Sequence, residues 1–195
     1  MTGRRILAGV VVALLASGAA TAGNDKVTIE GGSVTGVATV NAAAGSVNQQ
    51  VNAGVISSSG DFASAIGMLS QSMGDVPDST GKLVATVAPD SFAHSQGWVA
   101  VNGAAGSGNQ QANLAIIAIG INGAALSDMA LSQARAPHEP TGDPETEAAP
   151  PDRSVAIGRG AFANSSGLVQ VNLIGGDRNS SANVLTLAAS AGVGN

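Results

Sequence analysis

The sequence contains no cysteine, no tyrosine, three phenylalanines and a single tryptophan among its 195 residues. Without cysteine, neither a disulfide framework nor a thiolate metal site can stabilise the chain. Large aromatic rings normally supply much of the buried area of a core, so their scarcity excludes an ordinary globular core for a chain of this length. The 27 glycines and the abundant small residues indicate thin layers of closely stacked backbone instead.

Long apolar runs are also missing. Arg4 and Arg5 precede an apolar run at 6–16 that is too short to span a bilayer, and Ala20-Thr21-Ala22 has the small-x-small form of a cleavage site. We therefore predict a secretion signal over 1–22 and a mature chain that begins at Gly23. The alternative reading is an uncleaved membrane anchor.

Positive charge is scarce in the predicted mature chain. It keeps six Lys/Arg against thirteen Asp/Glu, because Arg4 and Arg5 leave with the signal, and its formal net charge is −7. No basic patch is present, so nucleic acid is not an expected partner. No second apolar segment is long enough to cross a membrane, and we expect a protein that passes through the periplasm to the outside of the cell.

An imperfect repeat occurs three times. Its copies read GVATVNAAAGSVNQQVN at 36–52, GWVAVNGAAGSGNQQAN at 97–113 and GLVQVNLIGGDRNSSAN at 167–183. All seven prolines lie outside these copies, and Asp177 and Arg178 are the only charged residues inside them. The predicted organisation is a signal at 1–22, an N-terminal segment at 23–30, repeats at 31–56, 87–122 and 154–190, linkers at 57–86 and 123–153, and a tail at 191–195.

Each copy predicts two short strands joined by a sharp bend. The first runs are 37–41, 98–102 and 168–172, where alternation puts the valines on one face and the asparagines on the other. Gly45, Gly106 and Gly176 suit the bend, because glycine tolerates positive φ. A second run follows in each copy and folds back as a β-arch or a hairpin; the two alternatives stay open.

Asparagine and glutamine explain how such copies stack. In-register strands about 4.7 Å apart place equivalent side chains over one another, so a charge would repeat its own repulsion in every layer. Amides instead bond to the same amide above and below. We predict an all-β fold in which the repeats form a short β-solenoid or cross-β amyloid unit with disordered linkers, and self-assembly ladders of Asn41, Asn48, Gln49, Gln50, Asn52, Asn102, Asn109, Gln110, Gln111, Asn113, Asn172, Asn179 and Asn183.

Other chemistry has weak support. Gly158, Gly160 and Ala163 imitate a dinucleotide fingerprint, but 164–167 interrupts the helix that a phosphate loop must open. His94 lies in a repeat flank and His138 in the acidic, proline-dense linker, whose carboxylates lack a recognisable cation-loop spacing. That linker is predicted to be disordered. We expect no cofactor, no metal and no catalytic residue.

With these repeats, two unlike linkers and a secretion signal, the chain resembles the fibre subunits of the Fap functional-amyloid system of biofilm-forming bacteria. The resemblance implies export through an outer-membrane pore and assembly into extracellular amyloid fibres for biofilm matrix and adhesion, with a second fibre subunit as a further expected partner. Such subunits commonly end in Cys-x-x-Cys, whereas this chain ends in SAGVGN. The rival function is a monomeric β-solenoid adhesin that binds a surface ligand without polymerising.

Overall fold

The computed structural model describes residues 11–17, 24–59, 63–65, 67, 69–73, 76, 81–120, 124–126, 131–134 and 152–190. These residues form strands and turns without a helix, which confirms the predicted all-β class. Accordingly, no described helix is long and apolar enough to cross a membrane.

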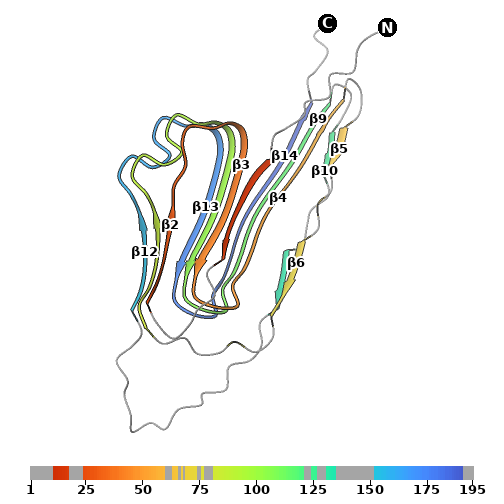
Figure 1. Ribbon diagram of the computed structural model, residues 1–195. Helices are drawn as coiled ribbons and strands as arrows, with labels where there is room; N and C mark the ends of the chain where they lie inside the picture. Colours follow the sequence, from red (N-terminus) through yellow and green to blue (C-terminus); the bar gives the residue numbers. More distant parts are fainter. Residues whose placement is uncertain are drawn as a thin grey trace, which may run out of the picture.

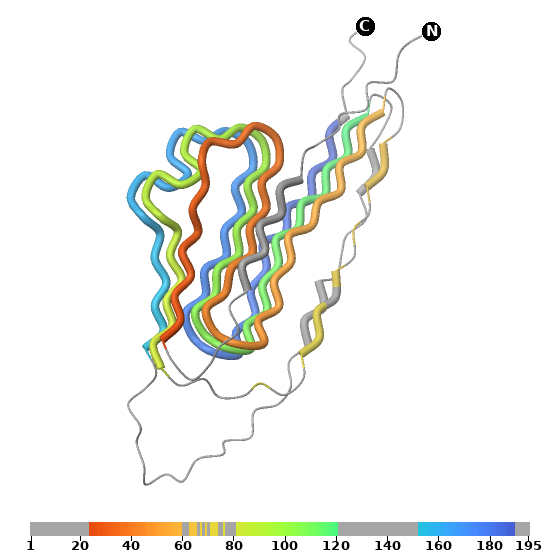
Figure 2. The backbone as a smooth tube through the Cα atoms, in the orientation of Figure 1, coloured from red at the N-terminus to blue at the C-terminus, as the bar shows by residue number. Residues whose placement is uncertain are grey.

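The described chain builds three layers of three strands each (Figures 1 and 2). Layer 1 is 24–59, layer 2 is 81–120 and layer 3 is 152–190. Their strands are β2 (Asp25–Ile29), β3 (Thr35–Ala44) and β4 (Gln49–Ser58) in layer 1; β7 (Leu83–Val87), β8 (Gln96–Ala105) and β9 (Gln110–Gly120) in layer 2; and β12 (Arg153–Ile157), β13 (Ser166–Gly175) and β14 (Ser180–Ser190) in layer 3.

Equivalent strands of the three layers pair in parallel, and layer 2 is always in the middle. The sheets are β2-β7-β12, β3-β8-β13 and β4-β9-β14. Their registers place Asn41 opposite Asn102 and Asn102 opposite Asn172, as stacking of identical repeat positions requires. Because β3 and β4 belong to different sheets, each copy is a β-arch rather than a hairpin. The prediction of stacked repeats is confirmed.

The first strand of each layer lies at the edge of, or outside, the predicted repeats. β2 falls in 23–30 and β7 mostly in 57–86, which the sequence analysis treats as linker. These strands carry no Asn/Gln motif, so alignment of the repeat centres does not detect them. They matter because they cover the valine face of the central sheet.

That valine face forms the main apolar core. Val40 and Val101 pack with Ile29, Val87 and Phe92, all of which are buried. The rings of Phe92 and Phe162 stack with centroids 5.6 Å apart, and the Phe92 ring occupies the space that a side chain at position 31 would need. This contact explains why the first copy has Gly31 where the other copies have phenylalanine.

Short additional strands flank the layers. β5 (Ala63–Ala65) pairs with β10 (Ala124–Leu126), and β6 (Leu69–Ser72) pairs with β11 (Leu131–Ala134), so both predicted linkers contribute strands. Ala63 and Ala65 pack against Leu114 and Ile116 of β9. The acidic, proline-dense residues 135–150 lie outside the described residues.

The predicted secretion signal also contains a strand. β1 (Val11–Ser17) pairs in parallel with β3, from Val11 opposite Val37 to Ser17 opposite Ala43. It lies on the outer edge of layer 1, where the four-stranded sheet has the order β1-β3-β8-β13. The edge of β3 therefore accepts a further parallel strand.

Candidate functional site: the amide ladders

Two asparagine ladders face each other inside the arches. In the first, the Nδ2 of Asn102 donates to the Oδ1 of Asn41 at 2.9 Å, and the Nδ2 of Asn172 donates to the Oδ1 of Asn102 at 3.1 Å. In the second, Asn113 donates to Asn52 at 2.8 Å and Asn183 to Asn113 at 2.9 Å. In these two ladders, layers 2 and 3 each donate amide protons to the layer before them.

The two ladders are also joined within every layer. Asn52 donates to Asn41 at 2.8 Å, Asn113 to Asn102 at 3.0 Å and Asn183 to Asn172 at 3.0 Å. Backbone carbonyls complete the network, since the Nδ2 atoms of Asn102 and Asn113 also lie 3.0 Å from the oxygen of Val51 and 3.2 Å from the oxygen of Val101. The result is one continuous polar seam between β3-β8-β13 and β4-β9-β14.

Burial makes this seam energetically important. Asn102, Asn109, Gln110, Gln111 and Asn113 are 0% exposed, because layers 1 and 3 cover both sides of layer 2. A satisfied hydrogen bond contributes about 1 kcal/mol net, whereas a buried polar group left unsatisfied costs about 1–3 kcal/mol. The amide side chains of the middle copy therefore depend on hydrogen-bond partners inside the stack.

Glutamines extend the seam in layers 1 and 2. The Nε2 of Gln50 donates to the Oε1 of Gln111 at 2.6 Å, and the Nε2 of Gln110 donates to the Oε1 of Gln49 at 3.2 Å. In layer 3 serines take these positions, and the Oγ of Ser181 donates to the Oδ1 of Asn172 at 3.0 Å. The weaker third copy thus replaces the bond between layers with a bond inside its own layer.

A third asparagine ladder lies at the bend. Asn48 donates to the oxygen of Gly106 at 2.8 Å and Asn109 to the oxygen of Gly176 at 2.9 Å. The side-chain oxygen of Asn109 accepts from both the backbone N–H and the Nδ2 of Asn179, at 3.0 and 3.2 Å. These asparagines tie the bend of one layer to that of the next.

The bend glycines have the positive φ that the sequence analysis expects. Their φ values are 112° for Gly45, 146° for Gly106 and 122° for Gly176. A Cβ at Gly45 would collide with the carbonyl oxygen of Gly106, and a Cβ at Gly106 with that of Gly176. Stacking therefore requires glycine as much as the backbone angle does.

Gly36, Gly97 and Gly167 are further functional residues, for which the repeat pattern alone predicts no role. They also have positive φ, and a Cβ at Gly97 or Gly167 would collide with the carbonyl oxygen of the stacked glycine. The signal was available, because glycine opens all three copies of the repeat.

The charged pair inside the third copy is satisfied within the molecule. The Nε of Arg153 lies 3.3 Å from the Oδ1 of Asp177, and Arg178 donates to the oxygen of Val76 at 2.9 Å. The Oδ1 of Asp177 also accepts the backbone N–H of Ser107 at 2.6 Å. These two charges lie at the bend and not in the asparagine seam.

Trp98 fills the position that Val37 and Leu168 occupy in the other layers. Its Nε1 donates to the Oε1 of Gln170 at 2.9 Å, and Gln170 is buried. We expect Trp98→Phe to lower the free energy of unfolding by about 1–3 kcal/mol, because the Gln170 oxygen loses its indole donor. Urea unfolding followed by circular dichroism measures this change, and an unaltered midpoint would contradict it.

The structure does not support the alternative dinucleotide or metal sites in the described residues. Gly158, Gly160 and Ala163 lie at the turn between β12 and β13, where no helix begins, and His94 is exposed in the matching turn of layer 2. No group of three or more potential metal ligands occurs in the described parts of the chain. His138 and its neighbouring carboxylates lie outside those parts.

The chain matches the model of a known protein family. The family model of the functional amyloid protein FapB/FapC family matches residues 12–190, which include all three layers. No solved structure matches the chain. The match covers the repeats that carry the amide ladders.

Proposed function

This chain belongs to the functional amyloid protein FapB/FapC family, which confirms the resemblance drawn from the repeats, and we propose that it is a secreted structural subunit that self-assembles into extracellular fibres. Its activity is polymerisation, with no catalytic step. The fibres would serve in biofilm matrix and adhesion.

The observation that carries this proposal is the unfinished stack. Layer 2 has a parallel neighbour on both sides in all three sheets, whereas β12, β13 and β14 have a neighbour on one side only. Open parallel edges with unpaired N–H and C=O groups template further strands. In-register amide ladders add the side-chain complementarity that stabilises amyloid.

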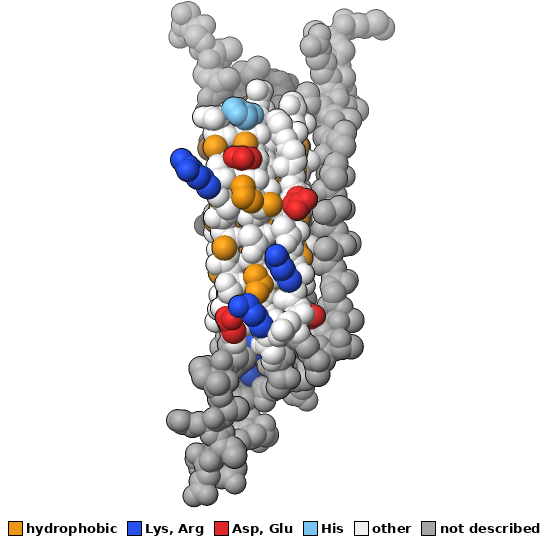
Figure 3. Space-filling model, turned by 60° about the vertical axis from the view of Figure 1, so that its left-hand side comes forward, with side chains coloured by type: hydrophobic (Ala, Val, Ile, Leu, Met, Phe, Trp, Pro, Cys, Tyr) orange, Lys and Arg blue, Asp and Glu red, His pale blue; other side chains and the backbone are white. Residues whose placement is uncertain are grey.

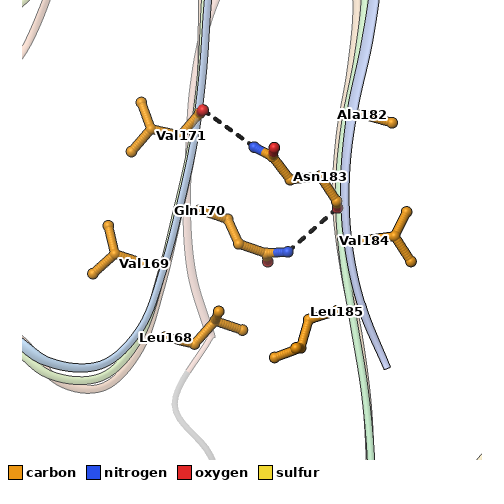
Figure 4. A pocket seen from close by; sticks show the side chains of 8 residues that line it. All are labelled: Leu168, Val169, Gln170, Val171, Ala182, Asn183, Val184 and Leu185. Carbon is orange, nitrogen blue, oxygen red and sulfur yellow. Dashed lines mark hydrogen bonds between the residues drawn. The ribbon is translucent and has the colours of Figure 1, made fainter. Parts of the chain in front are cut away.

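The outer surface of layer 3 supports the same function. A hollow of ≈ 590 Å³ lies there between β13 and β14, lined by Leu168, Gln170, Asn183 and Leu185 among others. In Figure 4, Gln170 and Asn183 point toward each other across it, and each bonds to a carbonyl of the opposite strand. At this end of the polar seam Asn183 is half-buried, whereas Gln170 and Asn172 are buried, and the amides of another layer would continue the seam.

The ladder residues named in the sequence analysis, together with Gly45, Gly106 and Gly176, are the proposed self-assembly site. The main partner is another copy of the same chain. A second fibre subunit and an outer-membrane secretion pore are further proposed partners, because the chain carries a predicted signal and belongs to this family.

A direct experiment tests the proposal against the adhesin alternative. The chain beginning at Gly23 is incubated near micromolar concentration and followed by thioflavin fluorescence, electron microscopy and fibre diffraction. We expect unbranched fibres with a repeat of about 4.7 Å along the axis. Persistent soluble monomers would favour the monomeric adhesin instead.

A further inference from the structure

We infer that copies join head to tail, with layer 3 of one copy stacked in register on layer 1 of the next, and that Arg159 and Glu30 form the ion pair that locks this junction. The inference rests on the proposed self-assembly and names the surfaces that it uses. It follows from the charges, the shapes and the hydrogen-bonding directions of the two ends.

The two ends of the stack carry opposite net charge. Layer 1 has a net charge of −1, layer 2 is neutral and layer 3 has a net charge of +1. Complementary charge favours contact between unlike ends and disfavours contact between like ends. Figure 3 shows one side of the stack, where acidic and basic side chains are scattered among hydrophobic and uncharged ones. The charged residues are Asp25, Lys26 and Glu30 in layer 1, Lys82 and Asp90 in layer 2, and Asp152, Arg153, Arg159, Asp177 and Arg178 in layer 3.

Layer 1 has a notch that layer 3 can fill. The turn between the first two strands is shorter in layer 1, at 30–34, than in layers 2 and 3, at 88–95 and 158–165. The missing residues leave a hollow of ≈ 520 Å³ lined by Glu30, Gly31, Gly32, Ala88, Pro89 and Ser91. Arg159 belongs to the longer turn of layer 3 and has no counterpart in layer 1.

Register brings Arg159 to this notch. Ile29, Val87 and Ile157 occupy equivalent positions, and backbone hydrogen bonds continue the register through the next residue of each layer. A layer 1 stacked on layer 3 therefore places its Glu30 over Gly158, one residue from Arg159. Both side chains are exposed, and neither forms an ion pair within the part of the chain that the structure describes.

Asp25 lies in register with the same junction. Its Oδ2 is buried and has no hydrogen-bond partner. Asp25 is in register with Leu83 and Leu83 with Arg153, so within one molecule an apolar layer separates the carboxylate from the guanidinium. Across the inferred junction, Asp25 would lie directly over Arg153 and its partner Asp177.

The amides give the junction a direction. Within the molecule, Asn113 donates back to Asn52 and Asn183 donates back to Asn113. At the outer end of layer 3, the Oδ1 of Asn183 accepts no described hydrogen bond, whereas the Asn52 amide has no earlier layer to which it donates. Layer 1 of the next copy would continue the direction of this ladder, with its Asn52 donating to Asn183.

β1 occupies part of the inferred interface. It pairs with β3 over Val37–Ala43, where β13 of a neighbouring copy would pair. The three layers hold all of their mutual strand pairs without it. The chain that begins at Gly23 therefore keeps the stack and leaves the layer 1 edge open.

Charge reversal tests the junction. Seeded growth of the chain from Gly23 is measured at low salt for wild type, Glu30→Arg, Arg159→Glu and the double variant. We expect each single reversal to slow growth about tenfold or more, since each places like charges together, and the double variant to recover most of the wild-type rate. Equal rates for all four proteins, or slow growth of the double variant, would overturn the inference.

A matched pair of variants separates this effect from net charge. Glu30→Gln and Asp90→Asn change the net charge equally. The carboxylate of Asp90, in layer 2, however, points toward Gly160 in layer 3 of the same molecule and away from the notch. We expect only Glu30→Gln to slow growth, and equal slowing would contradict the junction. If wild type forms no fibres, the proposed function itself fails; fibres that are indifferent to Glu30 and Arg159 overturn only this inference.

Discussion

Asn102→Asp is expected to abolish fibre growth at neutral pH and to destabilise the stack by about 3–5 kcal/mol or more, the cost of an uncompensated buried charge. The amide of Asn102 donates to the oxygens of Asn41, Val51 and Asn52, at 2.9, 3.0 and 3.1 Å. A carboxylate has no proton to donate, so three acceptors would face an anion at a site that is 0% exposed. The measurements are urea unfolding and seeded thioflavin growth.

The sign of the pH dependence follows from burial. Burial and the surrounding acceptor oxygens would raise the pKa of the introduced carboxyl above its unfolded value of about 4. The penalty is then complete above the raised pKa and fades as the pH falls toward about 4. Growth of Asn102→Asp should therefore recover partly in acid, relative to wild type at the same pH.

Asn164→Asp is the matched control for this substitution. Asn164 is exposed in the turn before β13 and has a φ of 55°, a conformation that aspartate also adopts. We expect near wild-type growth and stability at every pH. Growth of Asn102→Asp at the wild-type rate at pH 7 would mean that the seam does not control assembly.

Gly106→Ala is expected to have the second large effect. The strained φ of 146° alone costs about 1–3 kcal/mol for a residue with a Cβ. The new methyl group would also collide with the carbonyl oxygen of Gly176, so the bends of layers 2 and 3 could no longer stack. We expect a loss of cooperative unfolding or a sharply lowered midpoint, together with loss of fibre growth.

Gly32→Ala controls for the removal of a glycine. A Cβ at Gly32 would meet no atom within 4 Å, and its backbone has no positive φ. We expect unchanged or slightly raised stability, because alanine restricts the unfolded chain. Because Gly32 also lines the notch of layer 1, the comparison is made in urea unfolding and not in fibre growth. An equal loss of stability in Gly32→Ala and Gly106→Ala would show that bend geometry is not the cause.

Much of the seam follows from the sequence because in-register stacking has a simple rule. Once 36–52, 97–113 and 167–183 are aligned, parallel pairing puts equivalent residues opposite each other, and the registers of β3, β8 and β13 do so. The same alignment placed Trp98 in line with Val37 and Leu168. Neither result needed knowledge of how the arches pack.

The packing of the two strands of an arch against each other was harder to predict from the sequence. The cross-links between Asn41 and Asn52 join residues whose relation depends on how the two sheets face each other. The bond from Trp98 to Gln170 joins neighbouring strands of one sheet, but Gln170 lies two residues from the position opposite Trp98, so the register alone does not identify it as the partner. The first strand of each layer also escaped detection, since β2, β7 and β12 are five residues long, carry no amides, and in β2 and β12 begin with charged or polar residues. They pack against the valines of another sheet, and no local sequence pattern identifies those valines as their partners.

The sequence by itself determined that three copies stack with their amides in line, because side chains repeat at fixed offsets and a parallel register preserves those offsets. The tertiary structure alone decided that the copies are arches, that layer 2 is enclosed by the other two, and that the ends differ. Alternation of apolar and polar residues is the same for a hairpin and an arch. Only the direction of backbone hydrogen bonding, along the stack and not across the bend, distinguishes them.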